Sequence, residues 1–438
     1  MNALLTDLYE LTMAAGYFEA GMHRDIATFE MSIRRLPKNR GFVLACGIPQ
    51  AVAYLGDLRF AREEIEYLGS LPQFARVRPE FFDFLAELRF TGEVRAAAEG
   101  TPVFPGEPLM TVRAPIIEAQ IAETYLLSIV AFQSMVATKA ARVVAAAEGR
   151  SVVEFGTRRA HSPEAGVLAG RAAYIGGCIG TSNVLTGFRY GVPVYGTAAH
   201  SWVQAFPSEM ESYRRLQTLL GEGTIYLIDT YDTVEGARKA AALGRPLWGV
   251  RLDSGDLAAL SREVRGILDR AGLTDAKIMA SGDLDEYRIR ALVRDGAPID
   301  AFGVGTELAT SADAPSLPAV YKLVEIETNG STRYTTKLST DKLVMPGGKQ
   351  IWRYADHDCI TRWDERIEDG EARPLVNRIM AAGELTGPLA DERAAREYAA
   401  RSLAGLPEGC RMHEQPQEFG VEYSASLRRL LEEARRGI

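Results

Sequence analysis

Short apolar runs rich in Val and Ile recur through the middle of the chain, separated by segments with a helical pattern. The runs are SVVEF (151–155), VPVYGT (192–197), TIYLID (224–229), LWGVRL (247–252), KIMAS (277–281), IDAFGVG (299–305) and AVYKLVEI (319–326). Because buried strands that alternate with helices form parallel sheets with right-handed crossovers, the pattern predicts an α/β fold. Seven expected strands favour a (β/α) barrel, irregular in places, over an open sheet.

The pattern changes on both sides of this series. Residues 1–112 mix short helices with strand-like runs, and residues 336–438 lose the alternation of strand and helix. We therefore expect an N-terminal α+β region over 1–112, the barrel over 113–335 and an appended C-terminal region over 336–438 that packs on both. The most apolar stretch, 124–138, is shorter than the roughly 17–25 residues of a membrane-spanning helix, so it predicts a buried helix.

Charge and cysteine content narrow the class of protein. The chain has 438 residues with 50 Lys and Arg against 58 Asp and Glu, a net charge of −8. Because proteins that bind nucleic acids or anionic membranes usually carry a basic surplus, this balance argues against both partners. Four cysteines without CxxC pairs indicate reduced thiols, and the N-terminus lacks the basic segment of a secretory signal. We therefore expect a cytoplasmic globular protein.

Polar residues directly follow six of the expected strands. In chain order these segments are GTRRAHSPEAG, AAHSW, TYDT, DSGDL, GDLDE and TEL. In a barrel the carboxyl ends of the strands share one face, where active sites are built. Turns and helix caps explain Gly, Ser, Thr and Asp at such positions, but they do not require charged side chains. The loops nevertheless carry Arg158, Arg159 and His200, and Arg251 lies next to the end of its expected strand, so we predict a functional site on this face.

The chemistry of these loops favours anions. Segments 281–283 and 303–306 could each direct backbone N–H groups at a phosphate, although neither matches a nucleotide-binding signature. Arg251 offers a planar fork suited to carboxylate or phosphate. Asp253 could hold ribose hydroxyls or a hydrated Mg²⁺, whereas Asp256 is better explained as a helix N-cap.

Two further residues could take part in this site. His200 lies just past an expected strand and is one of five histidines, although a lone histidine is more often structural. Phe155 directly precedes the arginine-bearing loop, where a flat substrate would stack. A zinc site is the weaker alternative, because ligands with HxC and CxxH spacing fit zinc poorly; its members would be His357, Cys359, Cys410 and His413.

Several of these loops resemble one known family. The segments FGTRRAHSPEAG, YGTAAHSW, VRLDSGDL and GVGTEL together look like a nicotinate phosphoribosyltransferase. TDLYELTMAAGYF and FEMSIRRLPKNRGFVLACG resemble the N-terminal signatures of that family, and KLSTDKLVMPGGKQIWR resembles its segment after the barrel. The resemblance spans essentially the whole chain, with the motifs in the family's order, and residues from about 360 onward match only loosely. It implies an irregular barrel of the type II phosphoribosyltransferase kind, with a flanking α+β domain built from the N- and C-terminal segments.

The resemblance implies a reaction at the anomeric carbon of phosphoribosyl pyrophosphate. The ring nitrogen of nicotinate displaces pyrophosphate and gives nicotinate mononucleotide for NAD synthesis. ATP hydrolysis is coupled to the step, so the enzyme belongs to the ligase class although its chemistry is glycosyl transfer. Mg²⁺ is implied as a cofactor carried by the substrate pyrophosphate, and a homodimer is implied as the assembly.

The resemblance also assigns roles to residues. His200 matches the transiently phosphorylated histidine, Thr197 matches a threonine that binds nicotinate, and Arg158 matches the arginine beside the ring. Tyr9 matches an aromatic residue that closes over the pyridine ring, opposite Phe155, from the other subunit. Arg251 and Asp253 match residues that hold the phosphoribosyl group, and the 5-phosphate positions are Gly282, Asp283, Gly303, Gly305 and Thr306. Ser201 and Ser254 are further candidate contacts on the same loops.

Ser182 bears on the choice of substrate. The nicotinamide-using relative places an aspartate where this chain has Ser182 in GTSNV. A carboxylate there would repel nicotinate, whereas a serine can donate a hydrogen bond to it. Three alternatives stay open: a nicotinamide phosphoribosyltransferase, a quinolinate phosphoribosyltransferase that releases carbon dioxide, and a non-catalytic barrel that senses a small molecule.

Overall fold

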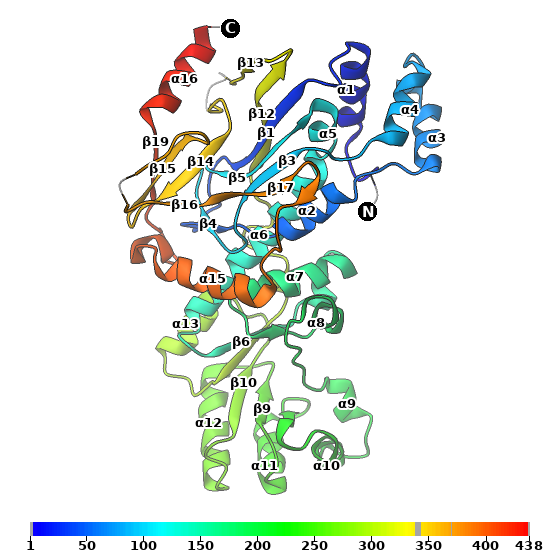
Figure 1. The fold of residues 1–438 in the computed structure, drawn as a ribbon. Helices are drawn as coiled ribbons and strands as arrows, with labels where there is room; N and C mark the ends of the chain where they lie inside the picture. Colours follow the sequence, from blue (N-terminus) through cyan, green and yellow to red (C-terminus); the bar gives the residue numbers. More distant parts are fainter. Residues whose placement is uncertain (1–2, 338–342, 369, 437–438) are drawn as a thin grey trace. The chain divides into compact units, whose positions relative to one another are not determined.

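The computed structural model describes residues 3–337, 343–368 and 370–436. The chain divides into two compact units, one of residues 1–135 with 316–438 and one of residues 136–315 (Figure 1). The N- and C-terminal segments therefore build one unit together, as the expected flanking domain requires. Part of the motif expected after the barrel, residues 338–342, lies outside the described residues.

The second unit is built on six parallel strands in the order β7-β6-β11-β10-β9-β8. Their bounds are β6 Ser151–Glu154, β7 Gly180–Thr181, β8 Ile225–Leu227, β9 Gly249–Leu252, β10 Lys277–Ala280 and β11 Ala301–Val304. Five of the seven expected strands are thus confirmed as neighbours in one parallel sheet. The two edge strands, β7 and β8, are not hydrogen-bonded to each other within the described residues, so the expected barrel is irregular.

Helices follow most of these strands, and Figure 1 shows α11 and α12 alongside β9 and β10. The sequence explains α12 directly: Asp256 caps its first turn by accepting a hydrogen bond from the Ala259 N–H at 3.1 Å, and an apolar stripe at helical spacing is buried. The expected role of Asp256 is therefore confirmed. The helices of this unit are α7 Pro163–Ile175, α8 Val184–Tyr190, α9 His200–Gln204, α10 Glu209–Leu220, α11 Thr233–Leu243, α12 Leu257–Arg270, α13 Glu286–Arg294 and α14 Thr306–Ala309.

Residues 192–197, expected to form a strand, do not form one. Val194 makes only an isolated parallel bridge with Thr181, the last residue of β7. Pro193 has no backbone N–H to donate, which interrupts a ladder at this point. The sheet instead uses β7, a two-residue strand that has no apolar run to reveal it in the sequence.

The last expected strand, residues 319–326, lies in the other unit and is antiparallel. It is the first part of β12 (Ala319–Thr328), which pairs with β1 (Ile26–Ile33) and with β13 (Ser331–Tyr334). Asn329 and Gly330 both have positive φ and join β12 to β13 as a tight hairpin. This Asn-Gly pair was the signal in the sequence that the segment begins a hairpin and not a strand-helix unit.

The first unit contains a seven-stranded sheet in the order β13-β12-β1-β5-β3-β17-β18, a four-stranded sheet in the order β16-β14-β15-β19, and the pair β2-β4. Its further strands are β2 Val43–Leu44, β3 Glu93–Ala97, β4 Pro102–Val103, β5 Pro108–Pro115, β14 Lys349–Arg353, β15 His357–Arg362, β16 Arg373–Pro374, β17 Val376–Ala381, β18 Glu384–Leu385 and β19 Gly420–Tyr423. Its helices are α1 Leu8–Glu19, α2 Ile48–Gly56, α3 Arg62–Ser70, α4 Pro79–Glu87, α5 Ile116–Ile121, α15 Glu392–Ala404 and α16 Ala425–Arg436.

Helix α6 (Glu123–Ala146) contains the apolar stretch and the boundary between the units. By length and composition alone it could cross a membrane, but 72% of its apolar window is buried in the structure. Burial of this kind is typical of a core helix, as the sequence predicted for 124–138.

A buried ionic cluster in the first unit makes its stability depend on pH. Arg353 donates from Nε to Asp358 at 2.9 Å and lies 4.0 Å from the carboxylate of Glu107, which accepts from the Phe104 N–H at 2.9 Å. Burial raises the pKa of Glu107 well above its ordinary value, and the nearby charge of Asp358 raises it further while Arg353 opposes the shift. The folded protein therefore keeps a proton that the unfolded chain loses.

The variant Glu107→Gln is expected to gain stability relative to wild type as the pH rises. Between the ordinary pKa of a glutamate and the raised one, only the unfolded wild-type chain gives up its proton, so the wild type's free energy of unfolding falls. Glutamine does not titrate and keeps an oxygen for Phe104. Thermal unfolding should give a more positive difference in Tm, variant minus wild type, at about pH 8 than at about pH 5. A difference that does not change with pH would contradict the assignment.

Candidate active site

A hollow of about 760 Å³ opens where the strands of the parallel sheet end. Its lining includes most of the predicted site residues: Phe155, Arg158, Ser182, Thr197, His200, Arg251, Asp253, Gly282, Asp283, Gly303, Gly305 and Thr306. It also includes Arg159, Val184, Val194, Tyr195, Gly196, Ala198, Ala199, Leu227, Ser281, Leu284 and Glu307. Loops from across the sheet therefore meet at one face, as the sequence predicted.

Two glycines let these loops approach one another closely. Gly282 has a φ of +91°, and a Cβ there would collide with the carbonyl oxygen of Asp253. A Cβ on Gly303 would lie 2.5 Å from the ring atom Cδ2 of Phe155. Larger side chains at either position would push apart the walls of the hollow.

Arg251 is the centre of the polar network on the floor of the hollow. Its guanidinium donates from Nε to Ser281 at 2.7 Å, from one terminal nitrogen to Thr197 at 2.7 Å, and from the other to Asp253 at 2.6 Å. Ser281 in turn donates to Asp253 at 2.5 Å. One planar side chain thus fixes three loops with three of its five N–H donors.

Asp253 stays charged in this setting. Burial by itself would raise its pKa, but the charge of Arg251, hydrogen bonds from Ser281 and Arg251, and the nearby His200 lower it below the ordinary value. The backbone N–H of Asp253 donates to Asp229 at 3.1 Å, and Ser254 donates to the same carboxylate oxygen at 2.5 Å. The other oxygen of Asp229 is buried without a hydrogen-bond partner in the described structure.

His200 lies at the start of α9 with its ring held from both sides. Its Nδ1 lies 3.1 Å from the hydroxyl of Thr230, and its Nε2 lies 3.8 Å from Asp253. The side chain is 42% exposed and lines the hollow, so the ring is accessible to a substrate. An exposed imidazole beside a hydroxyl and a carboxylate can act as a nucleophile or as a general base.

The loops after β10 and β11 offer unpaired backbone donors to the hollow. Within the described residues, no protein acceptor pairs with the backbone N–H of Gly282, Asp283, Gly305 or Thr306. Converging N–H groups of this kind bind phosphate oxygens well. The phosphate-binding role predicted for these loops stays a prediction.

The loops after β6 and β7 also line the hollow, and the loop after β6 lies next to the loop after β11. Phe155 lies there with its ring centroid 5.7 Å from the guanidinium carbon of Arg251. Arg158 and Arg159 are exposed in a 3₁₀ turn (Thr157–Arg159), and Ser182 follows β7. An aromatic face beside two cations and a hydroxyl suits a flat, negatively charged ligand.

The structure does not bring every predicted residue to the hollow. Tyr9 belongs to the other compact unit, near the start of α1, and 46% of its surface is exposed. Ser201 is exposed on α9, and Ser254 is exposed and donates to Asp229; neither lines the hollow. The roles predicted for these three residues stay predictions.

Sequence reasoning missed three residues that organise the site. Asp229 and Thr230 support Asp253 and His200, and a carboxylate directly after the run TIYLI was the available signal. Glu154 was taken as part of an apolar strand, yet its buried carboxylate binds both Gly156 and Thr181. A lone glutamate at the end of a buried strand was the signal here, because burial of a carboxylate requires hydrogen-bond partners.

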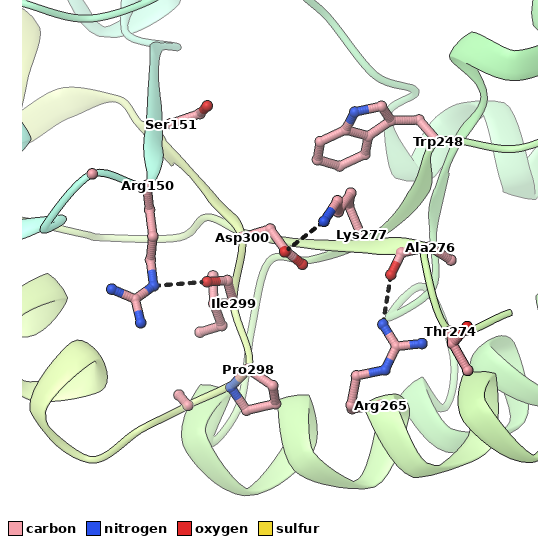
Figure 2. Close-up of a pocket in the computed structure, with 12 residues that line it drawn as sticks. Arg150, Ser151, Trp248, Arg265, Thr274, Ala276, Lys277, Pro298, Ile299 and Asp300 are labelled. Atoms are coloured by element: carbon pink, nitrogen blue, oxygen red, sulfur yellow. Dashed lines mark hydrogen bonds and ion pairs between the residues drawn. The ribbon is translucent and has the colours of Figure 1, made fainter.

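Another hollow, of about 660 Å³, lies at the opposite, amino-terminal edge of the same sheet (Figure 2). Its cations are engaged by the protein itself. Figure 2 shows Arg150 donating to the carbonyl of Ile299, Arg265 donating to the carbonyl of Ala276, and Lys277 paired with Asp300 at 3.2 Å. These contacts anchor loops, so we assign the site to the carboxyl edge. In the described part of the chain, no group of three or more His, Cys, Asp or Glu is placed to hold a metal, including the residues of the expected zinc alternative.

Comparison with known proteins gives consistent results along the chain. Three family models match in succession: the nicotinate phosphoribosyltransferase N-terminal domain over residues 4–131, the nicotinate phosphoribosyltransferase family over 150–343 and the C-terminal domain over 348–431. Nicotinate phosphoribosyltransferase pncB2 of Mycobacterium tuberculosis is 43% identical, covering 98% of this chain and 92% of that protein. The nicotinate phosphoribosyltransferase of Bacillus subtilis is 42% identical, covering 84% of this chain and 77% of that one.

Solved structures with a similar fold come from related enzymes. Human nicotinic acid phosphoribosyltransferase superposes with a TM-score of 0.87 at 29% identity, covering 98% of this chain and 99% of that one. Nicotinate-nucleotide pyrophosphorylase from Pyrococcus furiosus gives a TM-score of 0.75 at 27% identity, covering 92% and 95%. Fold, site and relatives define an enzyme that transfers phosphoribosyl groups on an irregular α/β barrel. The chain belongs to the nicotinate phosphoribosyltransferase family.

Proposed function

We propose that this chain transfers the phosphoribosyl group of phosphoribosyl pyrophosphate to nicotinate, with ATP hydrolysis coupled to the transfer. The products are nicotinate mononucleotide and pyrophosphate, for the synthesis of NAD in the cytoplasm. The observation that carries the proposal is the hollow itself, which brings a network centred on Arg251 together with an aromatic, cationic group of residues and with free N–H groups. Family membership along almost the whole chain supports it.

The aromatic end suits the pyridine ring. Phe155 would stack on the ring, and Arg158 and Ser182 would pair with its carboxylate. Thr197 lies at hydrogen-bond distance from Arg251, so its hydroxyl is fixed beside the ring. These contacts would aim the ring nitrogen at the anomeric carbon and hold it in line for displacement.

The other end suits the phosphoribosyl donor. Free N–H groups at Gly282, Asp283, Gly305 and Thr306 would bind the 5-phosphate. As the new bond from nitrogen to the anomeric carbon forms, the bond to pyrophosphate breaks and its electron pair leaves with the pyrophosphate. Arg251 lies where it would meet this growing negative charge, and enclosure of the site would exclude water that hydrolyses the donor.

Mg²⁺ fits this site as a partner of the substrate pyrophosphate. The described residues lack a group of three or more metal-binding side chains, but Asp229 has a buried oxygen without a partner close to the ionised Asp253. One or two carboxylates together with substrate phosphates is the usual way in which proteins bind Mg²⁺. When bound, the ion would neutralise the leaving pyrophosphate.

ATP is proposed to act through His200. Attack by a ring nitrogen on the γ-phosphoryl group would give phosphohistidine and ADP, and water would later release the phosphate. Imidazole is nucleophilic near neutral pH, and His200 is accessible beside the same anion-binding face. The described chain has no separate nucleotide-binding loop of the GxxxxGK[ST] type, so we place ATP at this face.

A homodimer is also part of the proposal. Helix α8, which begins at the wall of the hollow, leaves Val184 74% exposed and Phe188 86% exposed. Tyr9 and its neighbours Leu5, Leu8 and Met13 are exposed as well. Exposed apolar clusters of this kind are typical of association surfaces. We propose that Tyr9 closes over the pyridine ring of the partner subunit, opposite Phe155.

The enzyme is expected to turn over nicotinate at least about 100-fold better, in kcat/KM, than nicotinamide, because Ser182 can donate to the carboxylate while Arg158 neutralises it. Pyrophosphate release is measured with phosphoribosyl pyrophosphate, Mg²⁺ and ATP for each base. Ser182→Asp should lose the preference for nicotinate, because the new carboxylate repels the carboxylate of the substrate. Ser182→Asn is the control, because asparagine has the size of aspartate but no charge.

Three results would contradict the proposal. Comparable kcat/KM for the two bases would argue for nicotinamide as a substrate. Carbon dioxide release with quinolinate would favour the quinolinate alternative. Binding of nicotinate without pyrophosphate release would favour a sensor.

A further inference from the structure

Glu154 is a buried carboxylate at the base of the hollow with no place in the mechanism above. It is the last residue of β6, and its side chain is 0% exposed. No charged partner of this carboxylate is found among the residues that the structure describes. Burial raises its pKa, and the hydrogen bonds from Thr181 and Gly156 oppose that shift. A carboxylate buried without a cation is costly, so its retention calls for a specific role.

The two oxygens of Glu154 bind two different loops. Oε1 accepts from the backbone N–H of Gly156, which begins the turn that carries Arg158. Oε2 accepts from the hydroxyl of Thr181 at 2.5 Å, directly before Ser182. One side chain therefore spans the loop after β6 and the loop after β7.

Further hydrogen bonds close this link into a ring. The hydroxyl of Thr181 accepts from the backbone N–H of Asn183 at 3.0 Å, and the side-chain amide of Asn183 donates to Thr157 at 3.1 Å. The backbone N–H of Ser182 donates to the carbonyl of Glu154 at 2.9 Å. The bonds from Asn183 to Thr157 and from Ser182 to Glu154 join the same two loops, and the bond from Asn183 to Thr181 fixes the loop after β7 internally.

We propose that Glu154 is a positioning residue for the base-binding end of the site. Its carboxylate sets the distance between the loop that bears Phe155 and Arg158 and the loop that bears Ser182. The inference rests on the proposed function in that nicotinate is taken to bind between these loops. The predicted phosphate-binding loops after β10 and β11 make no hydrogen bond to this carboxylate, although Gly305 lies beside Phe155 and Gly156. We therefore expect a smaller effect on these loops than on the loop that bears Ser182.

The variant Glu154→Gln separates this role from general stability. The Gly156 N–H cannot turn, so the remaining oxygen stays with it and an amide nitrogen faces Thr181 in place of an acceptor. The hydroxyl of Thr181 then loses its acceptor and can only accept from the amide, so the bond to the loop with Ser182 is weakened. Thr181→Val removes the same bond from the other side, whereas Thr181→Ser keeps the hydroxyl and should behave as wild type.

Glu118 provides the matched control. It is also a buried carboxylate, accepting from the backbone N–H of Thr91 at 2.6 Å and from the hydroxyl of Thr91 at 3.1 Å, and burial raises its pKa too. It lies on α5, in the other compact unit. Glu118→Gln therefore removes an equivalent set of bonds and should lower Tm without changing either KM.

Steady-state kinetics in the full-length enzyme test the proposal. Glu154→Gln and Thr181→Val should raise KM for nicotinate roughly tenfold, while KM for phosphoribosyl pyrophosphate stays within about twofold of wild type. Equal rises in both KM values, or a lower Tm with unchanged KM as in Glu118→Gln, would overturn the positioning role. If Glu154→Gln fails to fold, the comparison of Thr181→Val with Thr181→Ser tests the positioning role without it.

Amide hydrogen exchange gives a readout that does not require activity. Residues 156–159 and 182–184 should exchange faster in Glu154→Gln and in Thr181→Val, while residues 282–285 should not change. Wild type that releases no pyrophosphate with nicotinate would contradict the proposed function. If the wild-type enzyme releases pyrophosphate with nicotinate but the variants keep wild-type KM values and exchange rates, only the role of Glu154 is contradicted.

Discussion

Arg251→Ala is expected to lower kcat/KM about 1,000-fold or more, the largest loss of any single substitution in the site. The guanidinium now donates to Ser281, Thr197 and Asp253, each on a different loop. Alanine leaves Asp253 without its principal cation and frees the hydroxyl of Thr197. Both the positioning of the base and the neutralisation of pyrophosphate are then lost together.

Arg251→Lys tests whether the planar fork matters beyond its charge. A lysine keeps one positive charge but cannot donate in three fixed directions, so it can satisfy Asp253 but not Ser281 and Thr197 at the same time. We expect an activity between that of alanine and that of wild type, with most of the loss in kcat. Activity equal to wild type would show that only the charge is needed.

Arg265 is the matched control for these variants. It also donates to three groups, Asp269 at 2.8 Å and the carbonyls of Ala276 at 2.5 Å and Leu273 at 2.6 Å, but at the amino-terminal edge of the sheet. Arg265→Ala should lower Tm and leave kcat/KM close to wild type. An Arg251→Ala enzyme within about tenfold of wild type would refute the central role of this arginine.

The order of five of the six parallel strands, β6, β8, β9, β10 and β11, could be predicted because each of these strands is a local apolar run followed by a polar loop. Segments 151–155, 247–252 and 277–281 carry this pattern and form β6, β9 and β10. Strand pairing is not local, however. Residues 319–326 have the same apolar character but are followed by a hairpin turn and pair with β1 in the other unit.

The site was predictable to the extent that its chemistry is displayed at strand ends. Arg158 and Arg159 follow β6 and Arg251 lies near the end of β9, and capping does not explain them. His200 was predicted from residues 192–197, which form no strand in the described structure. The residues that were missed act through buried hydrogen bonds, as Glu154 and Asp229 do, and a buried acceptor looks like any acidic residue until its donors are known. The strand β7 was missed because Gly180–Thr181 is too short to show a pattern.

His200→Ala is expected to abolish the phosphoenzyme and the stimulation by ATP, while weak transfer without ATP persists. The reason is that His200 supplies the nucleophilic ring nitrogen for the phosphoryl group, whereas the contacts to nicotinate and to the 5-phosphate come from other residues. The measurements are acid-labile label retained from radiolabelled ATP, and the ratio of pyrophosphate release with and without ATP.

Two further variants distinguish the nucleophilic role of His200 from the orienting role of Thr230. Thr230→Val removes the hydroxyl 3.1 Å from Nδ1 and should slow phosphorylation without abolishing it, because the ring loses its orientation but keeps its nitrogen. His357→Ala is the control and should leave labelling unchanged, because His357 lies on β15 in the other unit, where it pairs with Asp356. Full stimulation by ATP in His200→Ala would refute the phosphohistidine. In that case ATP would bind to the same face only as an effector. We would then expect its phosphates at the anion-binding loops after β10 and β11.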